Sequence, residues 1–176
     1  MQFYEALGLS PALALDADDL KKRFYERSRQ WHPDKFTRAG EAEREKALEM
    51  TAVLNDAFRT LRDPVARAEY FLKESGMELS KEAPPELLEE VFELNMALEE
   101  LRDGDEAVRP QLAAADERFR GMLAEVDRGL AELFARHDAA PSASALDAIR
   151  GALNRRRYVS NLVREVEKEL NVHTAN

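Results

Sequence analysis

Apolar residues recur every three or four positions along most of this chain, and that spacing constrains its fold more than any other feature. Proline, glycine or short polar runs interrupt the pattern and divide it into separate amphipathic segments. The charged fraction of 35% and the small numbers of Gly and Pro, 7 each, are typical of helices with solvated faces. The sequence therefore predicts an all-α protein with helices at about residues 3–8, 16–31, 41–62, 65–74, 86–101, 107–137 and 145–170.

The helices fall into an N-terminal and a C-terminal group. The N-terminal group predicts a helical hairpin with short flanking helices, and Pro84-Pro85 marks the end of the connection that follows it. We therefore expect domains at 1–75 and 86–176 and a linker at 76–85. The last three helices carry heptad-like seams, which predict a three-helix antiparallel bundle. The seam residues are Leu87, Val91, Leu94, Leu98 and Leu101, then Leu112, Ala115, Phe119, Met122, Val126 and Leu133, then Ile149, Leu153, Val159, Val163, Val166 and Leu170.

Composition excludes several functional classes. The net charge of −9 argues against nucleic-acid binding, because phosphate contacts need positively charged faces. The absence of cysteine excludes disulfides, thiolate catalysis and cysteine-ligated zinc or iron–sulfur sites. The N-terminus has no signal-peptide pattern and no apolar run approaches about 18 residues, so we expect a cytoplasmic protein that spans no membrane.

The remaining polar residues do not form an enzyme or metal site. His32, His137 and His173 fall in separate predicted elements without ligand spacing, so we expect no bound metal. No nucleophile, oxyanion donor set or Gly-rich phosphate loop accompanies His32 and Asp34, so we expect neither catalytic residues nor a cofactor. His137-Asp138 ends a predicted helix, and we interpret this pair as a helix-dipole contact.

The loop after the second helix contains His32-Pro33-Asp34. Pro33 fixes φ and stiffens the turn, so His32 and Asp34 are held as short polar groups at the tip of a helical hairpin. Asp34 can pair with a cation on a partner, and His32 can donate or accept a hydrogen bond. Residues 17–35 contain six basic side chains against four acidic ones, which suits an acidic partner surface unless the charges only solvate the helix. The basic residues are Lys21, Lys22, Arg23, Arg27, Arg29 and Lys35.

The arrangement around this loop resembles the J-domain over residues 1–75. The resemblance is carried by Tyr4, His32-Pro33-Asp34-Lys35-Phe36, Asn55-Asp56-Ala57-Phe58, Leu61, Asp63-Pro64 and Arg67-Ala68-Glu69-Tyr70. It implies that the partner is the nucleotide-binding region of a DnaK-type chaperone. The implied chaperone-binding residues are His32, Pro33, Asp34, Lys35, Lys21, Lys22 and Arg27.

An acidic helical bundle follows almost directly, without the Gly/Phe-rich linker or the cysteine-rich modules of DnaJ-type chaperones. With Arg67-Ala68-Glu69-Tyr70 and the Glu93-Leu94-Asn95 region, this architecture resembles the HscB family of iron–sulfur co-chaperones over nearly the full chain. The resemblance implies that the bundle binds the iron–sulfur scaffold IscU and brings it to an HscA-like chaperone, aiding cluster assembly or transfer.

The fifth helix has more large apolar residues than one seam needs. Leu88, Phe92 and Met96 form a second stripe at i, i+4 and i+8, and Tyr158 and Leu162 lie off the seam of the last helix. These residues either broaden the core or form an exposed partner site. The HscB resemblance favours the second reading and implies a scaffold-binding set of Leu88, Phe92, Glu93, Asn95, Met96 and Tyr158, with Glu93 and Asn95 at the polar rim. The alternative is a generic J-protein whose bundle is a structural or dimerisation module.

Charge is divided between the helices of the bundle. Residues 82–106 contain ten acidic side chains against the single basic Arg102, and residues 150–168 contain six basic against two acidic. The two segments can pair with each other, or Arg155 to Arg157 can meet the scaffold, and both alternatives stay open at this point.

Overall fold

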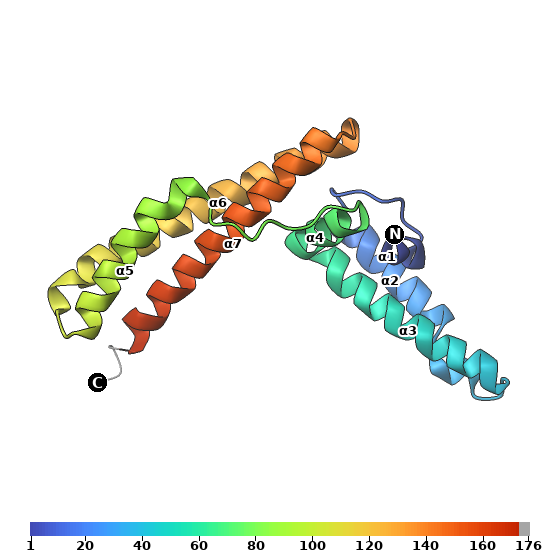
Figure 1. Ribbon diagram of the computed structural model, residues 1–176. Helices are drawn as coiled ribbons and strands as arrows, with labels where there is room; N and C mark the ends of the chain where they lie inside the picture. Colours follow the sequence, from blue (N-terminus) through green and yellow to red (C-terminus); the bar gives the residue numbers. More distant parts are fainter. Residues whose placement is uncertain (173–176) are drawn as a thin grey trace. The chain divides into compact units, whose positions relative to one another are not determined.

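The computed structural model of the protein describes residues 1–172, and every regular element in that range is a helix (Figure 1). In chain order they are α1 (Gln2–Leu7), α2 (Ala17–Gln30), the 3₁₀ turn η1 (Pro33–Phe36), α3 (Glu41–Arg62), α4 (Pro64–Glu74), η2 (Pro85–Leu87), α5 (Leu88–Arg102), η3 (Glu106–Val108), α6 (Arg109–Ala139) and α7 (Ala143–Val172). The all-α prediction is confirmed, and the predicted helices lie within a few residues of the observed ones.

These helices form two compact units. The first contains residues 1–78 and 134–141, and the second contains residues 79–133 and the described residues from 142 onward. The end of α6 thus packs within the first unit, although the sequence predicts it as part of the second domain. The division into functional domains at 1–75 and 86–176 stays a prediction.

In the first unit, local signals set the helix ends. α1 stops at Gly8, whose φ of 67° lies in the left-handed region that glycine adopts most easily. The side chain of Asp16 accepts a hydrogen bond of 2.7 Å from the Asp19 N–H and so caps α2. Asp63 caps α4 in the same way, with Pro64 at the first helical position. These positions could be predicted because each signal lies within a few residues of the helix end.

The α2–α3 hairpin is held by aromatic contacts and packs beside α1 and α4. The rings of Phe24 and Phe58 stack with centroids 4.3 Å apart. Of the predicted inner face of α2, Leu20 is fully buried, whereas Phe24, Ser28 and Trp31 are half-buried. The largest fully buried side chains of this unit are Tyr4, Leu7, Leu13, Leu20, Leu54, Leu61 and Leu72.

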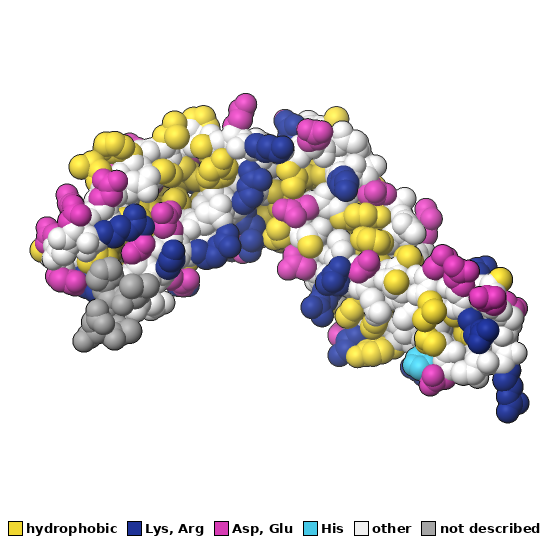
Figure 2. Space-filling model, turned by 60° about the horizontal axis from the view of Figure 1, so that its bottom comes forward, with side chains coloured by type: hydrophobic (Ala, Val, Ile, Leu, Met, Phe, Trp, Pro, Cys, Tyr) yellow, Lys and Arg dark blue, Asp and Glu magenta, His cyan; other side chains and the backbone are white. Residues whose placement is uncertain are grey.

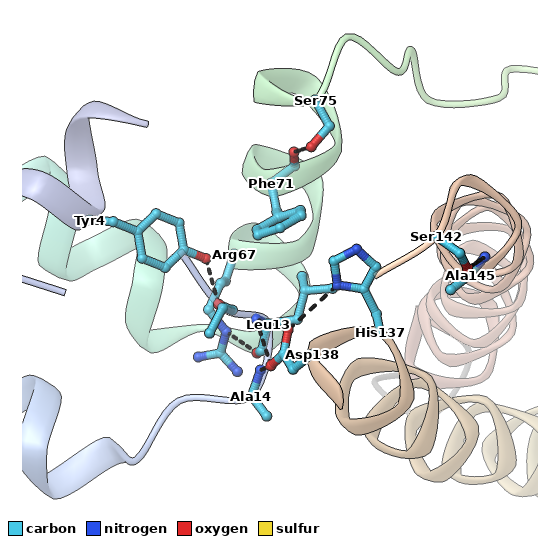
Figure 3. Close-up of polar contacts among 11 residues, drawn as sticks. Tyr4, Leu13, Ala14, Arg67, Phe71, Ser75, His137, Asp138, Ser142 and Ala145 are labelled. Atoms are coloured by element: carbon cyan, nitrogen blue, oxygen red, sulfur yellow. Dashed lines mark hydrogen bonds and ion pairs between the residues drawn. The ribbon is translucent and has the colours of Figure 1, made fainter. Parts of the chain in front are cut away.

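A buried arginine fixes the loop between α1 and α2. Arg67 of α4 donates a hydrogen bond of 2.7 Å to the Leu13 carbonyl oxygen (Figure 3) and one of 2.6 Å to the Leu61 carbonyl oxygen. The Asp138 carboxylate accepts from the Leu13 and Ala14 N–H groups of the same loop, at 2.7–3.0 Å. Burial lowers the pKa of Arg67 from its ordinary value. Two charged side chains therefore satisfy successive backbone groups of one loop.

Asp138 and its neighbour have a structural role that the sequence analysis did not identify. The His137 ring is buried and meets Phe71 edge-on, with centroids 5.3 Å apart. The interpretation of the pair as a helix-dipole contact is therefore incomplete, because Asp138 binds the loop at Leu13 and Ala14 rather than only ending its own helix.

We expect Arg67→Ala to destabilise the protein by about 2–4 kcal/mol, because the buried carbonyls of Leu13 and Leu61 would each lose a charged donor. Arg59→Ala is the matched control: Arg59 is exposed and pairs with Asp56 on its own helix at 2.9 Å. That control should change the free energy of unfolding by less than about 1 kcal/mol. Urea unfolding of both variants measures the difference, and equal losses would contradict the anchoring role of Arg67.

The second unit is a bundle in which consecutive helices run antiparallel, so that α5 and α7 are parallel. Two ion pairs link this parallel pair: Glu86, just before α5, with Arg155 near the middle of α7 at 2.8 Å, and Arg102 with Glu169 near their C-terminal ends at 2.5 Å. The core contains most of the predicted seam residues, with Phe119, Leu112 and Val166 fully buried. The predicted three-helix bundle is confirmed.

Two residues differ from the predicted seams. Leu162 lies off the predicted seam but is buried in the core, so the core-broadening alternative holds for this residue. Along α6, burial continues from Val126 to Leu130 and Phe134, and the predicted Leu133 is only half-buried. A straight helix with 3.6 residues per turn drifts away from a seven-residue repeat, so the buried face moves round the helix.

Candidate functional site

The His32-Pro33-Asp34 loop forms the tip of the α2–α3 hairpin. Pro33 opens the turn η1, in which the Lys35 N–H donates to the His32 carbonyl at 2.9 Å. The Asp34 N–H donates to Nδ1 of His32 at 3.3 Å, so the imidazole caps this turn. The rings of Trp31 and Phe36 stack beneath it with centroids 5.9 Å apart. The loop is therefore a short, internally bonded structure.

The polar groups at this tip face solvent. The Asp34 side chain is 87% exposed, and its carboxylate lies 3.5 Å from His32 Nδ1. Thr51 of α3 donates a hydrogen bond of 3.2 Å to the Trp31 carbonyl, which ties α3 to the end of α2. An exposed carboxylate on a fixed turn is available to a cationic group of another protein.

The predicted basic residues of α2 fall into two groups. Lys21 and Lys22 are exposed, as predicted for a docking face. Arg27 is half-buried, and its guanidinium lies over Gly8, where an added Cβ would come within 2.7 Å of Nη2. Arg23 donates to the Gly8 carbonyl at 2.7 Å. Arg23 and Arg27 therefore also help to hold α1 against α2.

Sequence reasoning missed an exposed aromatic residue on this helix. Tyr25 is 51% exposed and follows Lys21 by four positions and precedes Arg29 by four, so all three share one face of α2. The four-residue spacing of Tyr25 from Lys21 and Arg29 could have indicated this shared face, but a tyrosine in an amphipathic helix usually belongs to the core. The face thus combines positive charge with an aromatic ring, a composition common in binding hot spots.

The second stripe of α5 is exposed. Leu88 is 56%, Phe92 66% and Met96 49% exposed, and these are large apolar side chains on one helical face. Glu93 and Asn95 beside them are also exposed. The alternative in which the stripe broadens the bundle core is therefore wrong for these three residues. A row of exposed large apolar groups is typical of a protein-binding surface.

Tyr158 is less accessible than the stripe. Its ring is half-buried against the bundle core, and its hydroxyl donates to the Lys81 carbonyl at 2.9 Å. The Arg157 guanidinium lies 5.5 Å from the ring centroid. The expectation that Leu88, Phe92 and Tyr158 are exposed together is thus confirmed for Leu88 and Phe92 and only in part for Tyr158.

Basic residues of α7 pair mainly within the second unit, where Figure 2 shows Lys and Arg side chains in a row along this helix. Arg155 binds Glu86 at 2.8 Å, Arg156 binds Asp127 of α6 at 2.5 Å, and Arg157 donates to the Ser80 carbonyl at 2.6 Å. Hydrogen bonds from its own backbone N–H and from Arg155 lower the pKa of the Glu86 carboxyl. Of these three arginines, Arg155 alone pairs with the acidic segment 82–106, as the first alternative predicts, whereas Arg156 pairs with α6 and Arg157 with a backbone carbonyl.

In residues 1–172, no three His, Asp or Glu side chains lie together in a way that could hold a metal ion. No helix of this described range is both long and apolar enough to cross a bilayer. His173 lies outside the described residues.

Comparison with known proteins covers both units. Residues 2–70 match the DnaJ domain, and residues 83–167 match the HSCB C-terminal oligomerisation domain. The co-chaperone protein HscB homolog of Vibrio vulnificus strain YJ016 is 37% identical over 138 residues, spanning 74% of this chain and 80% of that protein. The homolog of Shewanella loihica is 32% identical over 175 residues, or 96% of each chain.

Solved structures of HscB have the same fold. The chaperone HscB from Vibrio cholerae matches with a TM-score of 0.69 and 29% identity, covering 97% of this chain and 98% of that one. Human co-chaperone protein HscB, at 22% identity and a TM-score of 0.69 over 95% of this chain and 81% of its own, shows the shared fold. With a DnaJ domain followed by an HSCB C-terminal domain, this chain belongs to the HscB family of co-chaperones.

Proposed function

We propose that this chain stimulates the ATPase of a DnaK-type, HscA-like chaperone and delivers an IscU-type iron–sulfur scaffold to it, aiding cluster assembly or transfer. The observation that carries the proposal is the exposed apolar stripe Leu88–Phe92–Met96 on an HSCB C-terminal domain, in a chain that also has a DnaJ domain. The chain itself supplies no catalysis or cofactor, and ATP hydrolysis belongs to the chaperone. The proposal includes a cytoplasmic location for this activity.

On the chaperone side, the proposed contacts are the tip and the basic face of α2. The tip presents His32, Pro33, Asp34 and Lys35, and the face presents Lys21 and Lys22, with Arg27 at its edge. Asp34 would pair with a cation of the chaperone, and the lysines would draw an acidic surface toward the helix. Exposure of Asp34 and of both lysines supports this role.

On the client side, the proposed anchors are Leu88, Phe92 and Met96. Removing large apolar groups from water on binding supplies most of the affinity in such interfaces. Glu93 and Asn95 would form the polar rim, and Tyr158 would contribute its exposed edge. The alternative occupant is a second copy of this chain, as the description of the matched C-terminal domain suggests. A dimer in sedimentation that Phe92→Ala dissociates would favour that alternative.

The chaperone side predicts a salt-sensitive activity. We expect stimulation of single-turnover ATP hydrolysis by a DnaK-type chaperone, with a stimulating concentration that rises several-fold between about 50 and 300 mM salt. The reason is that attraction by the exposed Lys21 and Lys22 is screened. Titration of the full chain at several salt concentrations measures this. Absence of stimulation would contradict the proposed function, and stimulation independent of salt would contradict electrostatic docking.

A further inference from the structure

An extended segment, residues 79–84, is bound along one face of α7, and we call it the strap. Three successive carbonyl oxygens of the strap accept hydrogen bonds from α7 side chains. Arg157 donates to Ser80 at 2.6 Å, Tyr158 to Lys81 at 2.9 Å, and Asn154 to Glu82 at 2.9 Å. The donors lie at i, i+3 and i+4, so they share one side of the helix.

The contacts form a connected network. The Asn154 side chain donates to Glu82 through Nδ2 and accepts from Arg157 through Oδ1 at 2.8 Å, so both of its polar atoms are used. Arg157 also lies over the Tyr158 ring, 5.5 Å from its centroid. At its end the strap is anchored by the buried Pro84. Loss of either the Asn154 or the Arg157 side chain would therefore weaken the whole network that holds the strap, and not only one hydrogen bond.

This network lies at the level of the exposed stripe. The two ion pairs between α7 and the segment of η2 and α5 have sequence separations of 69, for Glu86 and Arg155, and 67, for Arg102 and Glu169. Residues of α5 and α7 that lie opposite each other are therefore about 67–69 positions apart in the sequence. Tyr158 thus lies opposite residues 89–91 of α5, between Leu88 and Phe92 along the bundle axis. Tyr158, whose hydroxyl binds the strap, is thus the α7 residue at the same level as Leu88 and Phe92.

We propose that Asn154 and Arg157 are positioning residues for client binding: they hold the strap on α7, and the strap fixes the Tyr158 side chain at the level of the Leu88–Phe92 stripe along the bundle axis. This inference rests on the proposed function, because the client is the IscU-type scaffold that the stripe would bind. A preformed surface binds more tightly than one that must be ordered on binding. The strap supplies that order by fixing a rotatable aromatic side chain in the free protein.

The first test measures the strap in the free, full-length protein. We expect Asn154→Ala and Arg157→Ala to speed tryptic cleavage after the exposed Lys81 of the strap by about tenfold, because the hydrogen bonds that hold the strap carbonyls on α7 are lost and the segment can enter the protease. The matched control is Arg164→Ala, an exposed α7 arginine that binds Asn161 on its own helix. Cleavage after Lys81 should not change in that variant. Unchanged cleavage after Lys81 in both Asn154→Ala and Arg157→Ala would overturn the proposal.

The second test is a double-mutant cycle on affinity for purified IscU-type scaffold. Asn154→Ala should weaken binding about three- to tenfold in the wild-type background and have no further effect in a Tyr158→Ala background, since it acts through Tyr158. Asn154 is uncharged, so a change in net charge cannot produce this result.

The outcomes separate the inference from the proposed function. Equal, additive losses in the two backgrounds would show a general structural role and overturn the positioning role. If Phe92→Ala weakens scaffold binding while Asn154→Ala does not, the inference fails and the proposed function stands. If Phe92→Ala also leaves binding unchanged, the proposed function fails, whatever the cleavage measurement shows for the strap.

Discussion

Asp34→Asn should reduce stimulation of the chaperone's ATPase to the level of the chaperone alone, while the chain stays folded. The substitution keeps the shape of the side chain and removes its charge. Losing one partner of a close intermolecular charge pair costs about 2–5 kcal/mol, which corresponds to at least about thirtyfold in stimulating concentration. Stability should hardly change, because this side chain is 87% exposed. His32→Gln should act in the same direction, since it alters the other polar group of the tip.

Single-turnover ATP hydrolysis with increasing co-chaperone measures the effect, and circular dichroism checks the fold. Glu49→Gln is the matched control, because it also neutralises an exposed carboxylate of the first unit, on α3 rather than at the tip. It should retain stimulation. A folded Asp34→Asn variant with wild-type stimulation would show that the tip does not contact the chaperone as proposed.

The second large effect concerns two phenylalanines of the bundle. Phe92 is 66% exposed, whereas Phe119 is fully buried. Phe92→Ala should leave the free energy of unfolding within about 1 kcal/mol of wild type but weaken scaffold binding by about 2 kcal/mol or more. Phe119→Ala should cost about 3–5 kcal/mol of stability, because it leaves a cavity in the core.

Melting and scaffold affinity measured on the same preparations separate the two cases. Leu88→Ala should behave like Phe92→Ala. Tyr158→Ala should also cost some stability, because its hydroxyl binds Lys81 and its ring packs against the core. If Phe92→Ala melts at a sharply lower temperature, and binding falls only in proportion to unfolding, the stripe is structural.

Much of the helical architecture could be predicted because the determining signals are local. Asp16 and Asp63 cap α2 and α4, Gly8 ends α1, and Pro33 opens the turn at the hairpin tip. The exposed position of His32 and Asp34 follows from the same rules, because a short loop at the tip of a helical hairpin lies at the surface. The stripe of α5 could be identified for a similar reason: its apolar residues exceed what one bundle contact needs.

The rest depended on tertiary neighbours that leave no pattern in the sequence. Leu162 and Tyr158 are four residues apart on α7 and looked equivalent, yet one enters the core and the other reaches the strap. Asp138 binds backbone N–H groups more than a hundred positions away, at Leu13 and Ala14. The acceptors of the strap are backbone carbonyls, which every residue has, so no residue type reveals them.

The charge pattern shows the same limit. The acidic segment 82–106 and the basic segment 150–168 suggested pairing, but not which partners meet. Arg155 pairs with Glu86 just before α5, whereas Arg156 pairs with Asp127 of α6. Adjacent residues of a helix point about 100° apart, so neighbouring arginines reach different helices of the bundle.

The claim that one chain couples a chaperone to a client is tested most directly by the chaperone's ATPase rate, measured with and without IscU-type scaffold. Wild-type protein should stimulate hydrolysis, and added scaffold should raise the rate further. Phe92→Ala should keep the basal stimulation and lose the added enhancement, while Asp34→Asn should lose both. Full enhancement by scaffold in the Phe92→Ala and Leu88→Ala variants would contradict the coupling, because delivery would then not involve the exposed stripe of α5.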